Sequence, residues 1–219
     1  MAPRRRVITT EPSGGGSGSH PPVLDAVVSG ASRALVAEGD VDLLDVAGLD
    51  LSDVDLSGAD LANGLLTETV LRGARMPGAD LYRARLEAAV LDEADLAGAS
   101  LVKAELDGAS LRGARLDGAD FGSVEMYGVD AREASFRGAV LHGASLDAVD
   151  LRGADLSDAS VARTFLQVVL DDRTVVDGLT GTVFGPAVVV DAEGRRELSG
   201  ADLESWLNGK GAKVRVLSP

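Results

Sequence analysis

Residue types that commonly perform acid–base or metal chemistry are scarce in this chain of 219 residues. It has no cysteine and two histidines, His20 and His142. Neither histidine has a nucleophile or a second ligand at the spacing of a catalytic triad or a zinc site. The lack of cysteine excludes disulfides and thiol chemistry and agrees with a cytoplasmic location.

Two other segments resemble ligand-binding motifs only in part. Asp50, Asp53, Asp55 and Asp60 alternate as in a calcium loop, but the glycine at its sixth position and the closing glutamate are missing. The glycines at 14–16 lack the lysine of a phosphate-binding loop. The sequence therefore predicts a protein that is not an enzyme, with no metal site and no cofactor.

Charge carries most of the functional information. The chain has 35 acidic and 21 basic residues, a net charge of −14. Residues 41–170 hold 23 of the acidic and 11 of the basic residues, so this segment alone has a net charge of −12. The question is how the chain arranges these carboxylates in space.

A five-residue repeat determines this arrangement. It runs from residue 49 to residue 168 without a change of register. Its central position is nearly always leucine, and the position two residues earlier is usually alanine. Glycine often stands two residues after the centre, as in Gly58 and Gly98. A helix would spread positions five apart around its circumference. In an extended chain, by contrast, residues two apart point to the same side, so alanine and leucine both face inward and the last two residues turn the chain.

Units such as Ala59-Asp60-Leu61 and Ala94-Asp95-Leu96-Ala97-Gly98 resemble the pentapeptide repeat family. The resemblance covers residues 49–168 and implies an all-β solenoid, a right-handed four-sided β-helix with four repeats per coil. This segment would form about six coils, a rod roughly 29 Å long at about 4.8 Å per coil. The expected core includes Leu61, Leu81, Leu101, Phe121, Leu141, Leu66, Leu86 and Leu106.

The flanking segments differ from the repeat. Residues 1–22 are predicted to be a disordered polar tail, and residues 23–40 a helix that caps the rod 41–170. Residues 171–219 are predicted to form a small α/β appendage, with strands at 188–190 and 214–217 and a helix that begins after Ser199. Its single tryptophan, Trp206, either packs the appendage on the rod or anchors a partner.

With four repeats per coil, every fourth repeat lies on the same side of the rod, and one side is the most acidic. We call it the acidic side. Its carboxylates, opposed only by Arg85, belong to Asp45, Glu68, Glu87, Glu105, Asp107, Glu125 and Asp147. They either keep a repetitive protein soluble, with aspartates also bonding to backbone N–H groups at the corners, or they form a binding surface.

The binding interpretation predicts a non-catalytic scaffold or binding protein whose partner is a protein with a basic surface. The resemblance names a specific alternative, since some family members imitate the charge of duplex DNA and protect DNA gyrase from quinolones or gyrase poisons. Here, unlike in that subgroup, phenylalanine occupies only the centres 121 and 136, and the C-terminal segment is α/β. A homodimer is left open.

A second feature is a column of arginines, Arg72, Arg112, Arg132 and Arg152, interrupted by Asp92. Because acidic residues lie between them, we expect ion pairs between coils rather than a nucleic-acid site. No apolar run is long enough to cross a membrane, and three arginines near the start precede no apolar stretch, so neither membrane insertion nor a signal peptide is expected.

Overall fold

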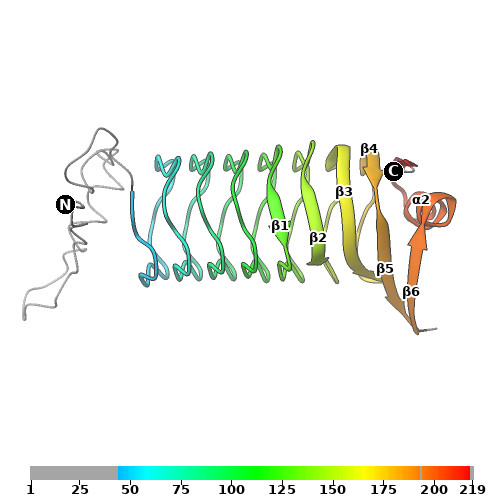
Figure 1. The fold of residues 1–219 in the computed structure, drawn as a ribbon, viewed down its shortest axis with the longest axis horizontal. Coiled ribbons are helices and arrows are strands. Elements are labelled where there is room, and N and C mark those ends of the chain that lie inside the picture. The colour runs from blue at the N-terminus through cyan, green and yellow to red at the C-terminus, as the bar shows by residue number, and fades with distance from the viewer. Residues whose placement is uncertain (1–43, 193, 218–219) are drawn as a thin grey trace, which may run out of the picture.

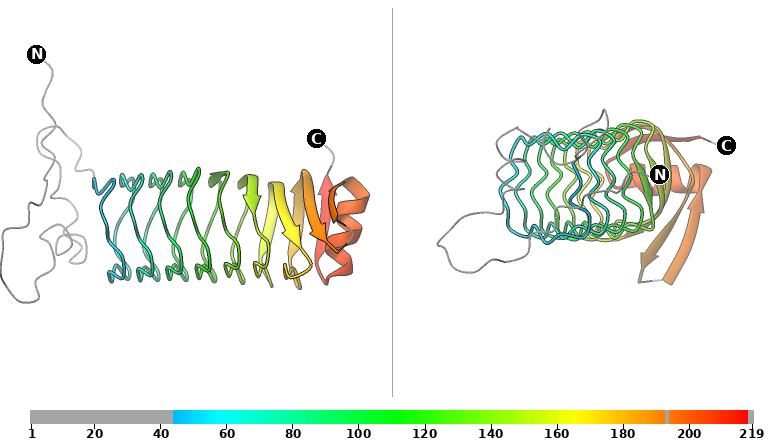
Figure 2. Two further views of the ribbon diagram at one scale, coloured as in Figure 1. Left: turned by 90° about the horizontal axis from the view of Figure 1, so that it is seen from below. Right: turned by 60° about the vertical axis from the view of Figure 1, so that its left-hand side comes forward.

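A rod of stacked coils makes up most of the molecule (Figure 1). The computed structural model describes residues 44–192 and 194–217. Turned partly toward its axis, the rod shows successive coils of similar outline stacked one behind another (Figure 2). The tail expected at 1–22 and the capping helix expected at 23–40 lie outside the described residues.

Each coil is four repeats long, as the resemblance implies. Parallel bridges join Asp45 to Leu65 and Leu65 to Arg85, and the column continues with this spacing as far as Glu125. There β1 (Glu125–Tyr127) pairs with β2 (Ser145–Asp150), and β2 pairs with β3 (Ser160–Asp171), which carries the column to Phe165. The column therefore advances by one coil at every pairing.

Leucine and alanine fill the interior, where the sequence analysis placed them. The predicted core residues are at most 1% exposed: Leu61, Leu81, Leu101, Phe121, Leu141, Leu66, Leu86 and Leu106. The rings of Phe121 and Phe136 meet with centroids 5.6 Å apart. Each coil thus buries its apolar residues against the next coil, and no single repeat could do so alone.

Corners are formed by tight turns that follow each central residue. In the turn after Met76, the N–H of Ala79 donates to the carbonyl of Met76 at 3.1 Å, and Gly78 has a φ of +67°. Glycine accepts this conformation readily, whereas residues such as Glu68, with a φ of +59°, adopt it at a cost of about 1 kcal/mol. Corners of this kind turn the chain four times per coil.

Parallel stacking continues past residue 170, where the sequence analysis expected the solenoid to end. Val175 pairs with Asp155, and both β4 (Thr180–Phe184) and β5 (Pro186–Asp191) pair in parallel with β3. Strand β7 (Lys213–Leu217) then adds to β4. The five-residue pattern is lost in this segment, but longer strands keep the inward alternation. The residues directly after 170 therefore continue the solenoid and do not begin an appendage.

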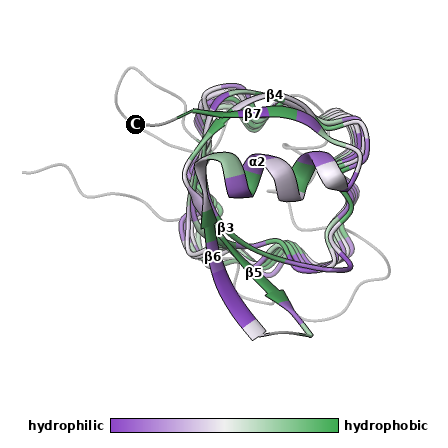
Figure 3. Cartoon of the chain, turned by 90° about the vertical axis from the view of Figure 1, so that its right-hand side faces the viewer, coloured by the Kyte–Doolittle hydropathy of each residue, from purple (hydrophilic) through white to green (hydrophobic). Residues whose placement is uncertain are grey.

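Among the described elements, β6 and α2 depart from the coil path. Strand β6 (Gly194–Ser199) runs antiparallel to β5, and this hairpin extends beyond the outline of the rod (Figure 3). Helix α2 (Gly200–Gly209) lies across the C-terminal end of the rod, with Leu203 and Leu207 buried. Ser199 directly precedes the helix, as predicted, but its side chain makes no capping hydrogen bond.

Helix α2 also occupies the outer edge of the last strand. The side-chain amide of Asn208 both donates to the carbonyl of Val214 and accepts from its N–H, each at 3.0 Å. One turn earlier, Oε2 of Glu204 accepts from the N–H of Val216 at 2.9 Å. Residues four apart on a helix span about 6 Å, close to the rise of two strand residues, so both side chains reach alternate residues of β7.

Candidate binding surfaces

The acidic side is one continuous surface of the rod. The register aligns its residues, since Arg85 pairs with Glu105, Glu105 with Glu125, and Tyr127 with Asp147 on the next coil. Five of its seven carboxylates belong to exposed residues, and two belong to half-buried ones, Glu87 and Asp147. The predicted carboxylates therefore do gather on one side.

On the other three sides, most aspartates are engaged in the turns. Asp80 is typical: its Oδ1 accepts from the N–H of Tyr82, two residues later, at 2.9 Å. The same bond recurs at Asp50, Asp55, Asp60, Asp95, Asp120, Asp130, Asp150, Asp155 and Asp171. The local role predicted for aspartate is confirmed. It explains these carboxylates without the need for a binding partner.

Few carboxylates of the acidic side have that role. Asp45 accepts from the N–H of Ala47, and Asp107 accepts from the N–H of Tyr127 on the next coil at 2.8 Å. The carboxylates of Glu68, Glu125 and Asp147 form no hydrogen bond or ion pair with the residues that the structure describes. Turn geometry thus explains most aspartates elsewhere on the rod but not these three carboxylates.

Arg85, the base that opposes these acids, is held by the carboxylates around it. Its Nη2 lies 2.7 Å from Oε1 of Glu87, and its Nε lies 3.8 Å from Oε2 of Glu105. Burial raises the pKa of Glu87, but hydrogen bonds from Arg85 and Thr67 outweigh burial, so this pKa lies below its usual value. Arg85 is therefore occupied within the acidic side.

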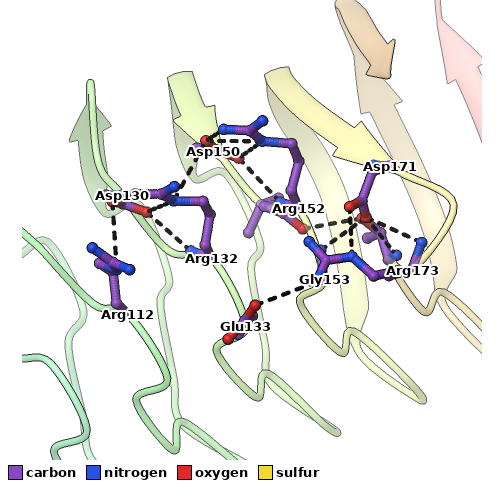
Figure 4. Close-up of polar contacts among 11 residues, drawn as sticks. Arg112, Asp130, Arg132, Glu133, Asp150, Arg152, Gly153, Asp171 and Arg173 are labelled. Atoms are coloured by element: carbon purple, nitrogen blue, oxygen red, sulfur yellow. Dashed lines mark hydrogen bonds and ion pairs between the residues drawn. The ribbon is translucent and has the colours of Figure 1, made fainter. Parts of the chain in front are cut away.

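The arginine column lies on the neighbouring side and forms ion pairs, as predicted (Figure 4). Arg132 donates to Asp130 at 2.6 Å, and its Nε lies 3.8 Å from Asp150 on the next coil. Arg152 repeats the pattern with Asp150 at 2.6 Å. These contacts lower the pKa of Asp130 and raise that of Arg132, mainly through their shared hydrogen bonds.

A groove of about 410 Å³ runs along this column. It is lined by Arg72, Asp92, Glu93, Arg112, Gly113, Arg132, Glu133, Arg152 and Arg173. Arg173 crosses it to reach Glu133 at 3.3 Å. Three acids line the groove and three aspartates, Asp130, Asp150 and Asp171, pair with its arginines, so the carboxylates outnumber the five guanidinium groups. The groove is an ion-paired seam between coils, not a cationic site.

Two exposed aromatic side chains on the acidic side were missed in the sequence analysis. Tyr127 is 61% exposed and Phe165 is 38% exposed. Their exposure could have been predicted from the sequence, because both occupy outward positions of the repeat, whereas Phe121 and Phe136 occupy central ones. Outward aromatic residues are not needed for the core.

The structure also bears on Trp206. Its ring is partly buried against the apolar core, and Nζ of Lys210 lies 4.9 Å from the ring centroid. This agrees with the packing interpretation of Trp206, while its use as an anchor for a partner remains a prediction.

Other site types find no support in the described part of the chain. No group of three or more histidine, aspartate or glutamate side chains is placed there to hold a metal ion. None of the described helices has the length and hydrophobicity that crossing a membrane requires.

Comparison with known families settles the classification. The model of the pentapeptide repeats matches residues 50–87, 89–124 and 125–160 with eight copies, which is half of the chain. The chain belongs to the pentapeptide repeat family. No curated protein sequence matches it.

Solved structures of pentapeptide repeat proteins are also similar. A trypsin-treated variant of QnrB1, a plasmid-mediated fluoroquinolone resistance protein, superimposes with a TM-score of 0.55 at 17% identity, over 81% of this chain and 84% of that one. A protein from the Arabidopsis thaliana thylakoid lumen is 33% identical over 42% of this chain, with a TM-score of 0.42, and the match spans 65% of its length. The QnrB1 likeness shows the fold alone.

Proposed function

We propose that this pentapeptide repeat protein is a non-catalytic binding protein whose acidic side contacts a protein with a basic surface. The observation that carries the proposal is that seven carboxylates gather on one side of the rod against the single base Arg85. Those of Glu68, Glu125 and Asp147 have no partner among the described residues. Glu105 and Glu125 also stack on adjacent coils, where like charges repel until a cation approaches. A basic surface would relieve this repulsion and would be guided to the rod by its field.

DNA gyrase is the specific candidate partner. QnrB1, which has the same fold, is a fluoroquinolone resistance protein, and a rod with a row of carboxylates offers a basic DNA-binding surface a charge pattern like that of duplex DNA. On this proposal the chain binds no nucleic acid itself, needs no cofactor and acts in the cytoplasm.

A gyrase supercoiling assay, with and without a quinolone, tests this candidate. The wild-type chain is compared with a variant in which Glu68, Glu105, Glu125 and Asp147 are lysine. We expect the wild-type chain to inhibit or protect gyrase and the variant to lose at least tenfold in potency.

The control reverses the same number of charges elsewhere, at Asp53, Glu93, Asp158 and Asp172, which are exposed residues on other sides. It should keep most of the effect. Equal losses in both variants would mean that net charge alone matters and would reject a specific acidic side. An inert wild-type chain would reject gyrase as the partner.

A further inference from the structure

Aromatic side chains distinguish the C-terminal half of the acidic side from the rest of it. Tyr127 lies in one outward column between Asp107 and Asp147, on consecutive coils. Phe165 lies in the other outward column, beyond Glu125 and Ser145. In this half, carboxylates and aromatic rings therefore share one surface.

The alternation of the strands turns both rings outward. In β1 the burial pattern is exposed, buried, exposed, so Met126 fills the core and Glu125 and Tyr127 both face outward. The backbone N–H of Tyr127 is fixed by Asp107, which holds this strand in place. Phe165 pairs in register with Phe184 of β4, which is half-buried, so the apolar surface extends toward the end of the rod.

The spacing of the two rings follows from the coil geometry. They are two coils apart along the rod and one outward column apart across it. At about 4.8 Å per coil and about 6.6 Å for two strand residues, this places their attachment points roughly 12 Å apart. Asp147 lies between them, beside Tyr127 in the register.

We propose that this half of the acidic side binds a cationic protein segment that carries aliphatic side chains between its lysines or arginines. The inference rests on the proposed function and deepens it. Carboxylates steer a basic segment but are screened by salt, whereas Tyr127 and Phe165 offer apolar area that salt does not weaken. A purely DNA-like surface would have no use for the two rings, so the partner is selected by apolar contacts as well as by charge.

Two short fluorescent peptides of equal length and charge test this, one made of lysine and leucine and the other of lysine and serine. Fluorescence anisotropy with the full chain should give a dissociation constant at least tenfold lower for the leucine peptide. Tyr127→Ser, alone and with Phe165→Ser, should remove this preference and leave serine-peptide binding unchanged. Because Tyr127 is 61% exposed, its replacement should not disturb folding.

Tyr82→Ser is the matched control, since Tyr82 faces outward on another side, beside Arg83 and Lys103. It should keep the full preference for leucine. Equal binding of the two peptides, or an equal effect of Tyr82→Ser and Tyr127→Ser, would overturn the inference. The proposed function fails separately if Glu105→Gln with Glu125→Gln leaves serine-peptide binding unchanged.

Discussion

At the scale of single residues, the same amino acid has different roles on different sides of the rod. Aspartate before a central residue accepts a hydrogen bond from its own turn, as Asp80 and Asp130 do. Glutamate at the same position, as at Glu105 and Glu125, has a longer side chain and makes no such bond in the described structure. At this position, aspartate therefore holds the corner, whereas glutamate leaves its carboxylate outside the turn.

The ion pair of Asp130 and Arg132 makes stability depend on pH. The folded chain lowers the pKa of Asp130 below 3.8, chiefly through the hydrogen bond from Arg132. A lowered pKa stabilises the fold above the unfolded value, and this contribution is lost as pH falls through the folded value. Because the pair is partly exposed, Arg132→Gln should lower the free energy of unfolding at pH 7 only slightly.

Urea unfolding of wild type and Arg132→Gln from pH 7 to pH 2.5 checks this. The difference between them should be constant down to about pH 5 and shrink below about pH 4. A difference that is as large at pH 2.5 as at pH 7 would show that Arg132 acts through packing and not through its charge.

At the scale of elements, helix α2 covers the outer edge of the last strand of the sheet. Unpaired strand edges promote association with other chains, and the outer edge of β7 offers N–H and carbonyl groups at Val214 and Val216. Asn208 and Glu204 occupy these groups. The helix thus covers the apolar end of the rod and also pairs with its last strand.

Asn208→Ala should therefore both weaken the fold and expose the edge. Two hydrogen bonds to Val214 are lost, for a destabilisation of about 1–3 kcal/mol. We expect concentration-dependent association in sedimentation velocity, which Ser205→Ala, on the exposed face of the same helix, should not cause. A variant that stays monomeric with wild-type stability would show that the bonds to Val214 do not protect the edge.

Much of the fold is predictable from the sequence, within the repeat and also beyond it, where the strands at 188–190 and 214–217 and the helix after Ser199 are confirmed. The five-residue period predicted the coil, the core and the bonding of aspartates such as Asp80, because each follows from local geometry. The predicted end of the solenoid at residue 170 is wrong, because β4 and β5 continue the stacking without the five-residue motif. The contacts of Asn208 with Val214 depend on two elements that meet only in the folded chain, and nothing local encodes them.

At the scale of the whole molecule, each coil contacts only its neighbours, so damage should remain local. Leu56→Ala removes a side chain that is 1% exposed near the N-terminal end of the described rod and should cost about 2–5 kcal/mol there. Trp206, the single tryptophan, lies on α2 and reports on the opposite end of the rod (Figure 1). Thermal melting by far-UV circular dichroism should shift more than melting by tryptophan fluorescence.

Val183→Ala removes a fully buried side chain of β4, near the opposite end. It should shift the fluorescence transition more than the circular dichroism transition. If both signals moved by the same amount in both variants, the rod would unfold as one cooperative unit.

The coil of four repeats also limits how such a gene can lengthen. Duplicating four consecutive repeats would add one layer of about 4.8 Å and leave every later side chain on its original side. Duplicating a single repeat would move every later residue a quarter of the way around the rod, so that Glu125 and Tyr127 would no longer line up with Glu105 and Asp107. Selection on the acidic side would therefore favour growth and loss by whole coils.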